Sequence, residues 1–492
     1  MTAGGSGNSG GPRGSRGSVA AVDLGATSGR VMLGHVSHNE LSLRPVARFP
    51  NSPVETIDGL HWNILELYRN VLAGLGAAVR EEPNLRSIAV DSWAVDYALI
   101  SGNRMLGNPF HYRDARTSAG VASTHALVSP EELYRANGLQ FLPFNTLYQL
   151  AADRESGALA SASSALLIPD LVTFWLTGVV CAEKTNATTT GLLGVHTRSW
   201  DDSLIQKLSL PRRLFPELIE AGTSIGALLP SVAAEVGSLI GPPLIVSAVG
   251  SHDTASAVVA MPSMSDDVAY ISSGTWSLVG VELETAVVSD AGRAANFTNE
   301  GGVDGRVRYL NNVMGLWLLS ESVRTWEKSG TTIDLPTLLA EAAQATSPVP
   351  VFNTDDSRFM APGNIPARIL EWCAENNTPG PRTMSEFVRS IIESLAEAYA
   401  TKIELLTALT GKTITAIHIV GGGSQNTLLC QLTADRTGRT VFAGPVEATA
   451  IGNVLIQART QGLVSGSLES LRALVARAFV PVRYEPRLPV RR

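Results

Sequence analysis

The residues best placed to do chemistry lie near mid-chain, at 245–259. An apolar run ends at Val249, a short polar cluster follows, and alanine and valine then recur at helical spacing. This pattern predicts a strand, a tight turn and the start of a helix. Such a turn exposes its side chains at one end of a sheet, where open α/β folds tend to bind ligands. Asp253 is the carboxylate of this turn, with His252 and Thr254 beside it.

Two roles are open for Asp253. An ordinary aspartate is ionised at neutral pH, so it could accept the proton of a reacting hydroxyl. Alternatively, Ser251 or Asp253 only caps the helix by satisfying backbone N–H groups that lack partners. Asp253 stands just before a segment whose pattern resembles that of the N-terminal residues, and this position favours the catalytic interpretation.

The N-terminal form of this pattern lies at residues 19–33, where two apolar runs are joined by a turn rich in glycine and hydroxyl side chains. The pattern predicts a β-hairpin whose successive N–H groups could wrap a phosphate. Neither GxxxxGK[ST] nor GxGxxG occurs in this stretch, so a purely structural hairpin stays open. Asp23 ends the first run and is placed to hold a hydrated Mg²⁺ near phosphates.

Residues 268–280 repeat this design, which suggests a duplicated fold with Thr275 in the second phosphate loop. A buried strand is predicted at 414–420, followed by a glycine-rich turn at 421–426 and a helix at 427–437. A turn of this kind offers bare backbone to a nucleotide, with helix N–H groups facing it. A tight structural turn is the alternative.

The stretch 87–100 places Asp91 and Asp96 at strand edges with Trp93 between them. An aromatic face beside carboxylates suits a sugar, because the ring covers C–H groups while the acids bind hydroxyls. Packing of Trp93 in the core is the alternative.

Other elements are expected from periodicity and turn residues. They are a strand at 40–48, a helix at 61–80 with Trp62 and Leu65 on its apolar side, polar loops at 111–116 and 296–302, a turn running into a helix at 311–319, a surface excursion at 347–381, and helices at 384–409 and from 444–452.

Composition is typical of a soluble globular protein of two or three domains, with 492 residues, 45% hydrophobic and 17% charged. A net charge of −7 gives no general attraction to nucleic acid or anionic membranes. Cys181, Cys373 and Cys430 are expected to be free thiols in a reducing compartment. The eight histidines form no HExxH pair, so a zinc site is not expected.

Residues 1–18 are mostly glycine and serine without an apolar core, which indicates a flexible tail and neither a signal peptide nor an anchor. No apolar run reaches the roughly 20 residues that span a bilayer. We therefore expect a cytoplasmic location.

Taken together, these residues resemble the FGGY carbohydrate kinases. The resemblance runs from Val19 to about Gln457 and rests on the motifs DLGATSGR (23–30), YRDARTSAG (112–120), GLQFLPFNTLYQL (138–150), TNATTT (185–190), SHDTASAVV (251–259), SSGTWSLVG (272–280), NFTNEGG (296–302) and VGGGSQNTLL (420–429). Each motif is weak alone, whereas the set is specific. It implies an α/β fold of two actin/Hsp70-like ATPase (ribonuclease H-like) domains with a cleft between them.

The implied division is a tail at 1–18, an N-terminal domain at 19–262 for sugar, phosphate and the catalytic base, a nucleotide-binding domain at 263–462 and an extension at 463–492. The implied activity is ATP- and Mg²⁺-dependent phosphorylation of the 1-hydroxyl of L-rhamnulose. Substrate and nucleotide are the expected partners, without nucleic acid or membrane, in a monomer or homodimer.

By this resemblance Asp253 is the proton acceptor. The sugar site comprises Ala94, His252, Asp253, Thr254 and Asn312, and the nucleotide site comprises Ala26, Thr27, Ser28, Gly29, Arg30, Thr275, Ser320 and Gly422. Two of these depart from the pattern: Ala94 replaces a common glycine, and Ser320 replaces a nucleotide-contacting glutamine. Thr433 and Thr437 replace a cysteine pair of some relatives.

Two alternatives follow. The chain could be an FGGY kinase for another ketose or polyol, such as fuculose or xylulose. It could also be a non-catalytic nucleotide-driven switch of the actin/Hsp70 type. A dependence of ATP consumption on added sugar separates the two classes.

Overall fold

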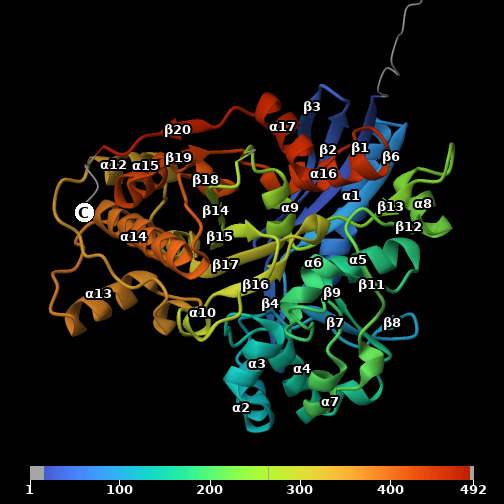
Figure 1. Cartoon of the computed structure of the whole chain (residues 1–492), viewed down its shortest axis with the longest axis horizontal. Helices are drawn as coiled ribbons and strands as arrows, with labels where there is room; N and C mark the ends of the chain where they lie inside the picture. The colour runs from blue at the N-terminus through green and yellow to red at the C-terminus, as the bar shows by residue number, and fades with distance from the viewer. Residues whose placement is uncertain (1–15, 264, 488–492) are drawn as a thin grey trace, which may run out of the picture.

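The computed structural model describes residues 16–263 and 265–487, which build two large mixed β-sheets with their covering helices and three small sheets of two or three strands (Figure 1). The first sheet belongs to the N-terminal half and the second to the C-terminal half. The tail predicted for 1–18 lies outside the described residues up to residue 15, and Gly17 already begins a strand.

The first sheet has six strands in the order β12-β13-β6-β1-β2-β3. Its bounds are β12 Ser224–Ala227, β13 Ile245–Ser247, β6 Leu85–Ser92, β1 Gly17–Leu24, β2 Ser28–Val36 and β3 Leu41–Pro50. Strands β1, β2 and β3 form an antiparallel meander, whereas β6 runs parallel to both β1 and β13. The predicted hairpin at 19–33 is therefore confirmed.

The second sheet repeats this topology with β14-β15-β17 as the antiparallel meander and β18 and β19 as the parallel strands. Its seven strands are β16 Thr298–Gly301, β17 Val307–Met314, β15 Trp276–Leu283, β14 Val268–Ser273, β18 Ala416–Val420, β19 Thr440–Ala443 and β20 Val482–Tyr484. The expected duplication of an α/β unit is confirmed.

Three helices fill the space between the sheets: α9 Asp253–Val259, α16 Ala448–Thr460 and α17 Leu468–Ala478. Their alanine, valine and leucine side chains share one buried cluster with β1 and β2. Gly452 of α16 lies so close to α9 that a methyl group there would overlap the carbonyl oxygen of Ser256. The two helices thus touch backbone to backbone.

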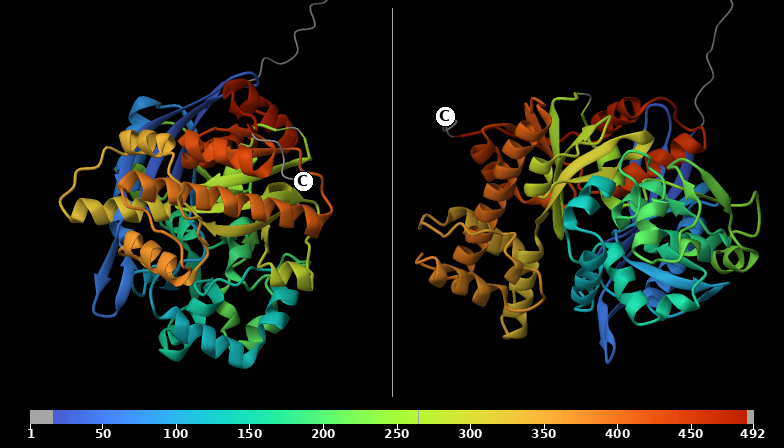
Figure 2. Two further views of the ribbon diagram at one scale, coloured as in Figure 1. Left: turned by 90° about the vertical axis from the view of Figure 1, so that its left-hand side faces the viewer. Right: turned by 60° about the horizontal axis from the view of Figure 1, so that its bottom comes forward.

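Other helices cover the outer faces. In the first half α1 Ile64–Glu81 and α5 Ile168–Thr177 pack on the sheet, and in the second half α14 Met384–Thr410 and α15 Thr427–Thr437 do so. A separate helical group, with α2 Thr117–Leu127, α3 Pro130–Asn137, α4 Thr146–Glu155 and α7 Asp202–Lys207, extends from the first half (Figures 1 and 2).

Several expected elements differ in the structure. The polar loop at 296–302 contains strand β16, and Asn311 and Asn312 lie in strand β17 rather than in a turn. The excursion at 347–381 contains helix α13 Ile365–Glu375, whose Ile365 and Ile369 are fully buried. The sequences of these segments are typical of loops, because polar residues outnumber the few apolar residues that pack into the core.

The helix expected at 61–80 begins only at Ile64, because Trp62 belongs to β5 Gly59–Trp62, and Leu65 is 59% exposed. At the C-terminal end, α17 packs into the central cluster and β20 extends the second sheet. All three cysteines are buried thiols. None of the helices in the described part of the chain has both the length and the apolar character for crossing a bilayer.

The α9–α16 contact predicts the effect of a single methyl group. Gly452→Ala should lower the free energy of unfolding by about 1–3 kcal/mol, the usual cost of overpacking a close contact. Urea unfolding monitored by tryptophan fluorescence would measure it. Gly107→Ala is the control, because a Cβ at Gly107 meets no atom within 4 Å. Equal stability of the two variants would contradict a backbone-to-backbone contact.

Candidate active site

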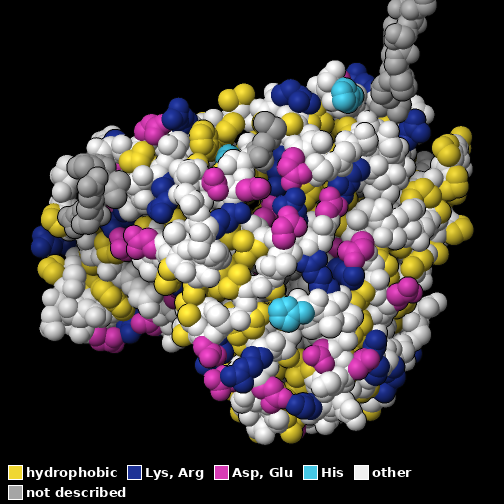
Figure 3. All heavy atoms as spheres, viewed as in Figure 1, with side chains coloured by type: hydrophobic (Ala, Val, Ile, Leu, Met, Phe, Trp, Pro, Cys, Tyr) yellow, Lys and Arg dark blue, Asp and Glu magenta, His cyan; other side chains and the backbone are white. Residues whose placement is uncertain are grey.

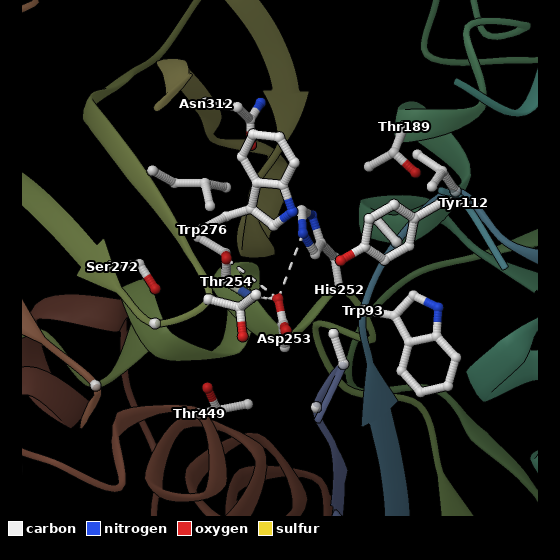
Figure 4. Close-up of a pocket in the computed structure, with 18 of the residues that line it drawn as sticks. Trp93, Tyr112, Thr189, His252, Asp253, Thr254, Ser272, Trp276, Asn312 and Thr449 are labelled. Carbon is white, nitrogen blue, oxygen red and sulfur yellow. Dashed lines mark hydrogen bonds and ion pairs between the residues drawn. The ribbon is translucent and has the colours of Figure 1, made fainter. Parts of the chain in front are cut away.

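One cavity of about 360 Å³ lies between the two halves and is lined by residues from both (Figure 4). From the first half come the loops after β1 and β6 and the turn before α9. From the second half come the β14–β15 turn, β16, β17 and the glycine-rich turn after β18. Its volume falls within the range of small-molecule sites.

Asp253 projects into this cavity from the first turn of α9, with its side chain 30% exposed. Its Oδ1 accepts hydrogen bonds from the backbone N–H of Thr254 at 2.5 Å and from Thr254 Oγ1 at 3.1 Å. His252 Nε2 lies 3.4 Å from the same oxygen. Three polar groups therefore gather at one wall, as the sequence predicted (Figure 4).

The capping alternative does not describe this turn. His252 is the N-cap of α9 and makes no side-chain capping bond. Ser251 Oγ donates instead to Glu183. Asp253 Oδ1 accepts from the residue directly after it, which leaves Oδ2 available to a ligand.

Glu183 holds the backbone of this turn in place through hydrogen bonds. Its buried carboxylate accepts hydrogen bonds from the backbone N–H and Oγ of Ser251 at 3.0 and 2.8 Å. It also accepts from the N–H and Oγ1 of Thr185 and from the N–H of Asn186. Thr185 Oγ1 in turn accepts from the N–H of His252 at 3.3 Å. The TNATTT segment thereby holds the backbone that presents Asp253.

The first hairpin contributes Asp23 and Arg30 to the cavity, joined by an ion pair of 2.8 Å. Burial raises the pKa of Asp23; the charge of Arg30 opposes the shift, and the nearby carboxylate of Asp253 adds to it. Arg30 also pairs with Glu447 at 2.6 Å. The carboxylates gathered here therefore carry more negative charge than Arg30 alone can balance.

The second hairpin and the glycine-rich turn face the first hairpin across the cavity. Thr275 and Gly422 both line it, and a Cβ on Gly422 would meet no atom within 4 Å. A Cβ on neighbouring Gly423 would overlap Ser273 Oγ, so this turn packs directly on the end of β14. Gly421 needs glycine as well, because its φ is +83°.

The other end of the cavity carries aromatic and amide groups. Trp93 and Ala94 lie opposite Asn312 of β17. Gln140 connects the halves here, because its Oε1 accepts from the backbone N–H of Asn312 at 2.8 Å and from Asn312 Nδ2 at 3.1 Å. Trp93 is only 5% exposed and both packs in the core and lines the cavity.

The expectation that Asp91 and Asp96 offer carboxylates to a sugar is wrong. Both are fully buried. Asp96 accepts from the indole N–H groups of Trp62 and Trp93, at 2.6 and 3.0 Å, and from Gln149. It orients Trp93 instead of binding a ligand.

Nearly all the residues predicted for the site meet in this cavity. They are Asp23, Ala26, Thr27, Ser28, Arg30, Ala94, His252, Asp253, Thr254, Thr275, Asn312 and Gly422. Gly29 and Ser320 do not line it. Gly29 faces the ring of Phe49 in the core, and Ser320 is exposed on α11 Trp317–Lys328.

Sequence reasoning gave no role to several residues of the site. Glu183 stands two residues before the TNATTT motif and Glu300 inside the NFTNEGG motif, but neither motif by itself indicated which atoms the carboxylate contacts. Other cavity residues without a predicted role are Tyr112, Gln140, Thr189, Trp276 and Thr449.

Sequence comparison then decides the family. A model described as the FGGY family of carbohydrate kinases, N-terminal domain, matches residues 18–260. The model of the C-terminal domain of the same family matches residues 269–460. The chain belongs to the FGGY family of carbohydrate kinases. As an FGGY kinase it is an ATP-dependent phosphotransferase, which sets aside the non-catalytic switch.

Two relatives of this FGGY kinase span nearly its whole length. A protein named rhamnulokinase from Enterobacter sp. (strain 638) is 41% identical over 471 residues, covering 95% of this chain and 94% of the relative. A rhamnulokinase from Bacteroides thetaiotaomicron is 39% identical over 470 residues, covering 95% of each chain.

Among solved structures, the gluconate kinase from Lactobacillus acidophilus superposes with a TM-score of 0.76 over 96% of this chain and 94% of that chain. Its sequence identity is 16%, so the likeness shows a shared fold. Two domains of the FGGY type, related to the actin/Hsp70-like ATPases, are therefore the architecture of this FGGY kinase.

The contacts of Glu183 predict a loss of turnover when its charge is removed. Glutamine keeps the size but offers only one acceptor oxygen to donors that now engage two. Glu183→Gln should lower kcat at least ~10-fold by displacing the Asp253 turn. Steady-state kinetics would measure this.

Asp170→Asn is the matched control. Asp170 is buried beside Glu183, burial raises its pKa, and asparagine keeps its size and one acceptor oxygen. Its Oδ1 contacts the backbone N–H of Glu183. Equal loss of kcat in both variants would show that burial alone, rather than support of the turn, explains the effect.

Proposed function

We propose that this FGGY kinase transfers the γ-phosphoryl group of ATP to the 1-hydroxyl of L-rhamnulose, giving L-rhamnulose 1-phosphate and ADP. The observation that carries the proposal is the match to relatives named rhamnulokinase at 39–41% identity over nearly the whole chain. The motif set of the cavity supports it.

Asp253 is proposed as the proton acceptor. Phosphoryl transfer needs alignment, charge neutralisation and a group that takes the hydroxyl proton as the new P–O bond forms. Asp253 is the partly exposed carboxylate that faces both halves, and one of its oxygens is not occupied by the Thr254 bonds. The proton of the ketose 1-hydroxyl passes to this carboxylate.

The sugar is proposed to lie between Ala94, His252, Thr254 and Asn312. These groups line one continuous region around Asp253, and they include backbone, hydroxyl, imidazole and amide donors and acceptors. The methyl group of Ala94 narrows the site relative to the glycine common in the family.

The nucleotide phosphates are proposed to bind at residues 26–30, Thr275 and Gly422. Two glycine-bearing turns face each other here, and their backbone N–H groups suit phosphate oxygens. Gly29 would contribute backbone alone. Ser320 receives no role, because it lies exposed on α11 outside the cavity.

Mg²⁺ is proposed to bind near Asp23 and Asp253. Burial and mutual repulsion of these carboxylates raise the pKa of Asp23, and a cation relieves that repulsion. Within residues 16–263 and 265–487, no cluster of three or more His, Cys, Asp or Glu is arranged for a metal. A site of one or two carboxylates completed by phosphates is typical of Mg²⁺. When bound, the ion neutralises charge on the phosphate oxygens.

The domain limits 19–262 and 263–462 remain predictions, with sugar and base in the first and nucleotide in the second. Closure of these domains would exclude water that otherwise hydrolyses ATP. A cytoplasmic location fits the use of ATP.

Replacing the proposed base predicts a loss of turnover with retained binding. Asp253→Asn should lower kcat at least ~100-fold, about 2.7 kcal/mol in the barrier. The variant should still bind ATP, because asparagine removes the base without changing the phosphate loops. Coupled measurement of ADP release checks the first and titration calorimetry the second. Near-wild-type turnover would remove Asp253 from this role.

The substrate itself is tested by ADP release across a panel of ketoses. L-rhamnulose should give the highest kcat/KM, ahead of L-fuculose and D-xylulose. Faster turnover of fuculose or xylulose would show that the chain is an FGGY kinase for another ketose. ATP consumption that is independent of every sugar would contradict a ketose substrate altogether.

A further inference from the structure

A buried glutamate–arginine pair forms part of the cavity wall. Glu300 of β16 and Arg308 of β17 lie directly opposite each other in the antiparallel register. Their side chains share the sheet face that points toward the first half, and Glu300 Oε2 lies 3.1 Å from Arg308 Nη2. Arg308 is 0% exposed and Glu300 6%, yet Glu300 lines the cavity.

The ion pair offsets the cost of burying the Glu300 carboxylate. Burial alone would raise the pKa of Glu300, but the charge of Arg308 holds this pKa below its usual value. A second glutamate, Glu282 of β15, also lies opposite Arg308 in the register. Its carboxylate pairs at 2.5 Å with Arg472, so Arg308 is left to Glu300.

The pair also fixes the imidazole of His252. Arg308 Nη2 lies 3.0 Å from His252 Nδ1. Because a guanidinium only donates, Nδ1 must accept, and the ring proton sits on Nε2. Nε2 faces Asp253 Oδ1 at 3.4 Å. A chain of contacts therefore runs from β17 through the imidazole to the proposed base.

Glu300 retains capacity for a further donor. Its Oε2 is buried against Arg308 Nη2 at 3.1 Å, whereas no hydrogen bond reaches Oε1 from the described residues. His252 Nδ1, at 3.3 Å, is an acceptor in the tautomer above. Because Glu300 lines the cavity, Oε1 is the carboxylate oxygen that can accept a hydrogen bond from a ligand there. Hydroxyl groups of a sugar are such donors.

We infer that Glu300 is a specificity-determining residue of the sugar site, whose carboxylate, charge-balanced by Arg308, accepts a hydrogen bond from a secondary hydroxyl of the bound ketose. Glu300 stands between His252 of the first half and Asn312 of the second, and so faces the proposed sugar site. This role rests on the proposed function. It adds Glu300 to the residues that were predicted from the sequence to contact the sugar.

The test compares two glutamate-to-glutamine changes on one sheet face. Glu300→Gln should raise KM for L-rhamnulose at least ~10-fold, since a site built to accept a hydroxyl loses its charged acceptor. KM for ATP should stay unchanged. Glu282→Gln is the matched control: it also leaves a buried arginine without its carboxylate, but Glu282 does not line the cavity.

Selectivity supplies a readout that a purely structural pair would not move. The ratio of kcat/KM between L-rhamnulose and its hydroxyl epimers should fall toward one in Glu300→Gln and stay unchanged in Glu282→Gln. Should Glu300→Gln prove unstable, the double variant Glu300→Gln with Arg308→Met removes the unpaired charge and is measured in the same way.

Three results would overturn the inference: parallel increases of KM for ketose and ATP, an unchanged KM for ketose, or an unchanged selectivity ratio. The wild-type panel keeps the two proposals separate. If the wild type prefers another ketose, the L-rhamnulose assignment is lost and Glu300 is judged on the KM of that ketose. If no ketose reacts, both proposals are lost.

Discussion

The active site depends on the contact between α9 and α16, where backbone meets backbone at Gly452. This contact holds the two sheets at a separation at which the first turn of α9 reaches the cavity from one half while the second half forms the opposite wall. Side chains larger than hydrogen at that point would separate the layers. Small residues in both helices therefore serve the geometry of the site as much as its packing.

Several buried carboxylates lie around the cavity, and the fold offsets their negative charge in different ways. Asp23 is paired with a partly exposed arginine, Glu300 with a fully buried one, and Glu183 only with hydrogen-bond donors. Asp253 faces the cavity with its side chain 30% exposed, and among the described residues its polar contacts are with its chain neighbours His252 and Thr254. Charge that the fold leaves unbalanced is thus concentrated where phosphate, cation and hydroxyl are proposed to meet.

Local patterns predicted the fold well, because each hairpin and strand-to-helix turn is encoded in about fifteen consecutive residues. The resemblance to the FGGY kinases, rather than the local patterns, placed Asp253 and Gly422 at one cleft. The supporting contacts were not predictable in this way. Glu183 lies 68 residues from Ser251, and Arg308 lies 56 residues from His252. Strand β16 was missed because its polar side chains face a cavity, which removes the usual apolar alternation.

The bridge between Gln140 and Asn312 has a further consequence. Each residue belongs to a different half, and the amide of Gln140 engages both the backbone and the side chain of Asn312. Any hinge motion that parts the halves would break this bridge and withdraw Asn312 from the proposed sugar site. If Asn312 binds the ketose as proposed, closure of the halves would complete the sugar site and exclude water in the same movement.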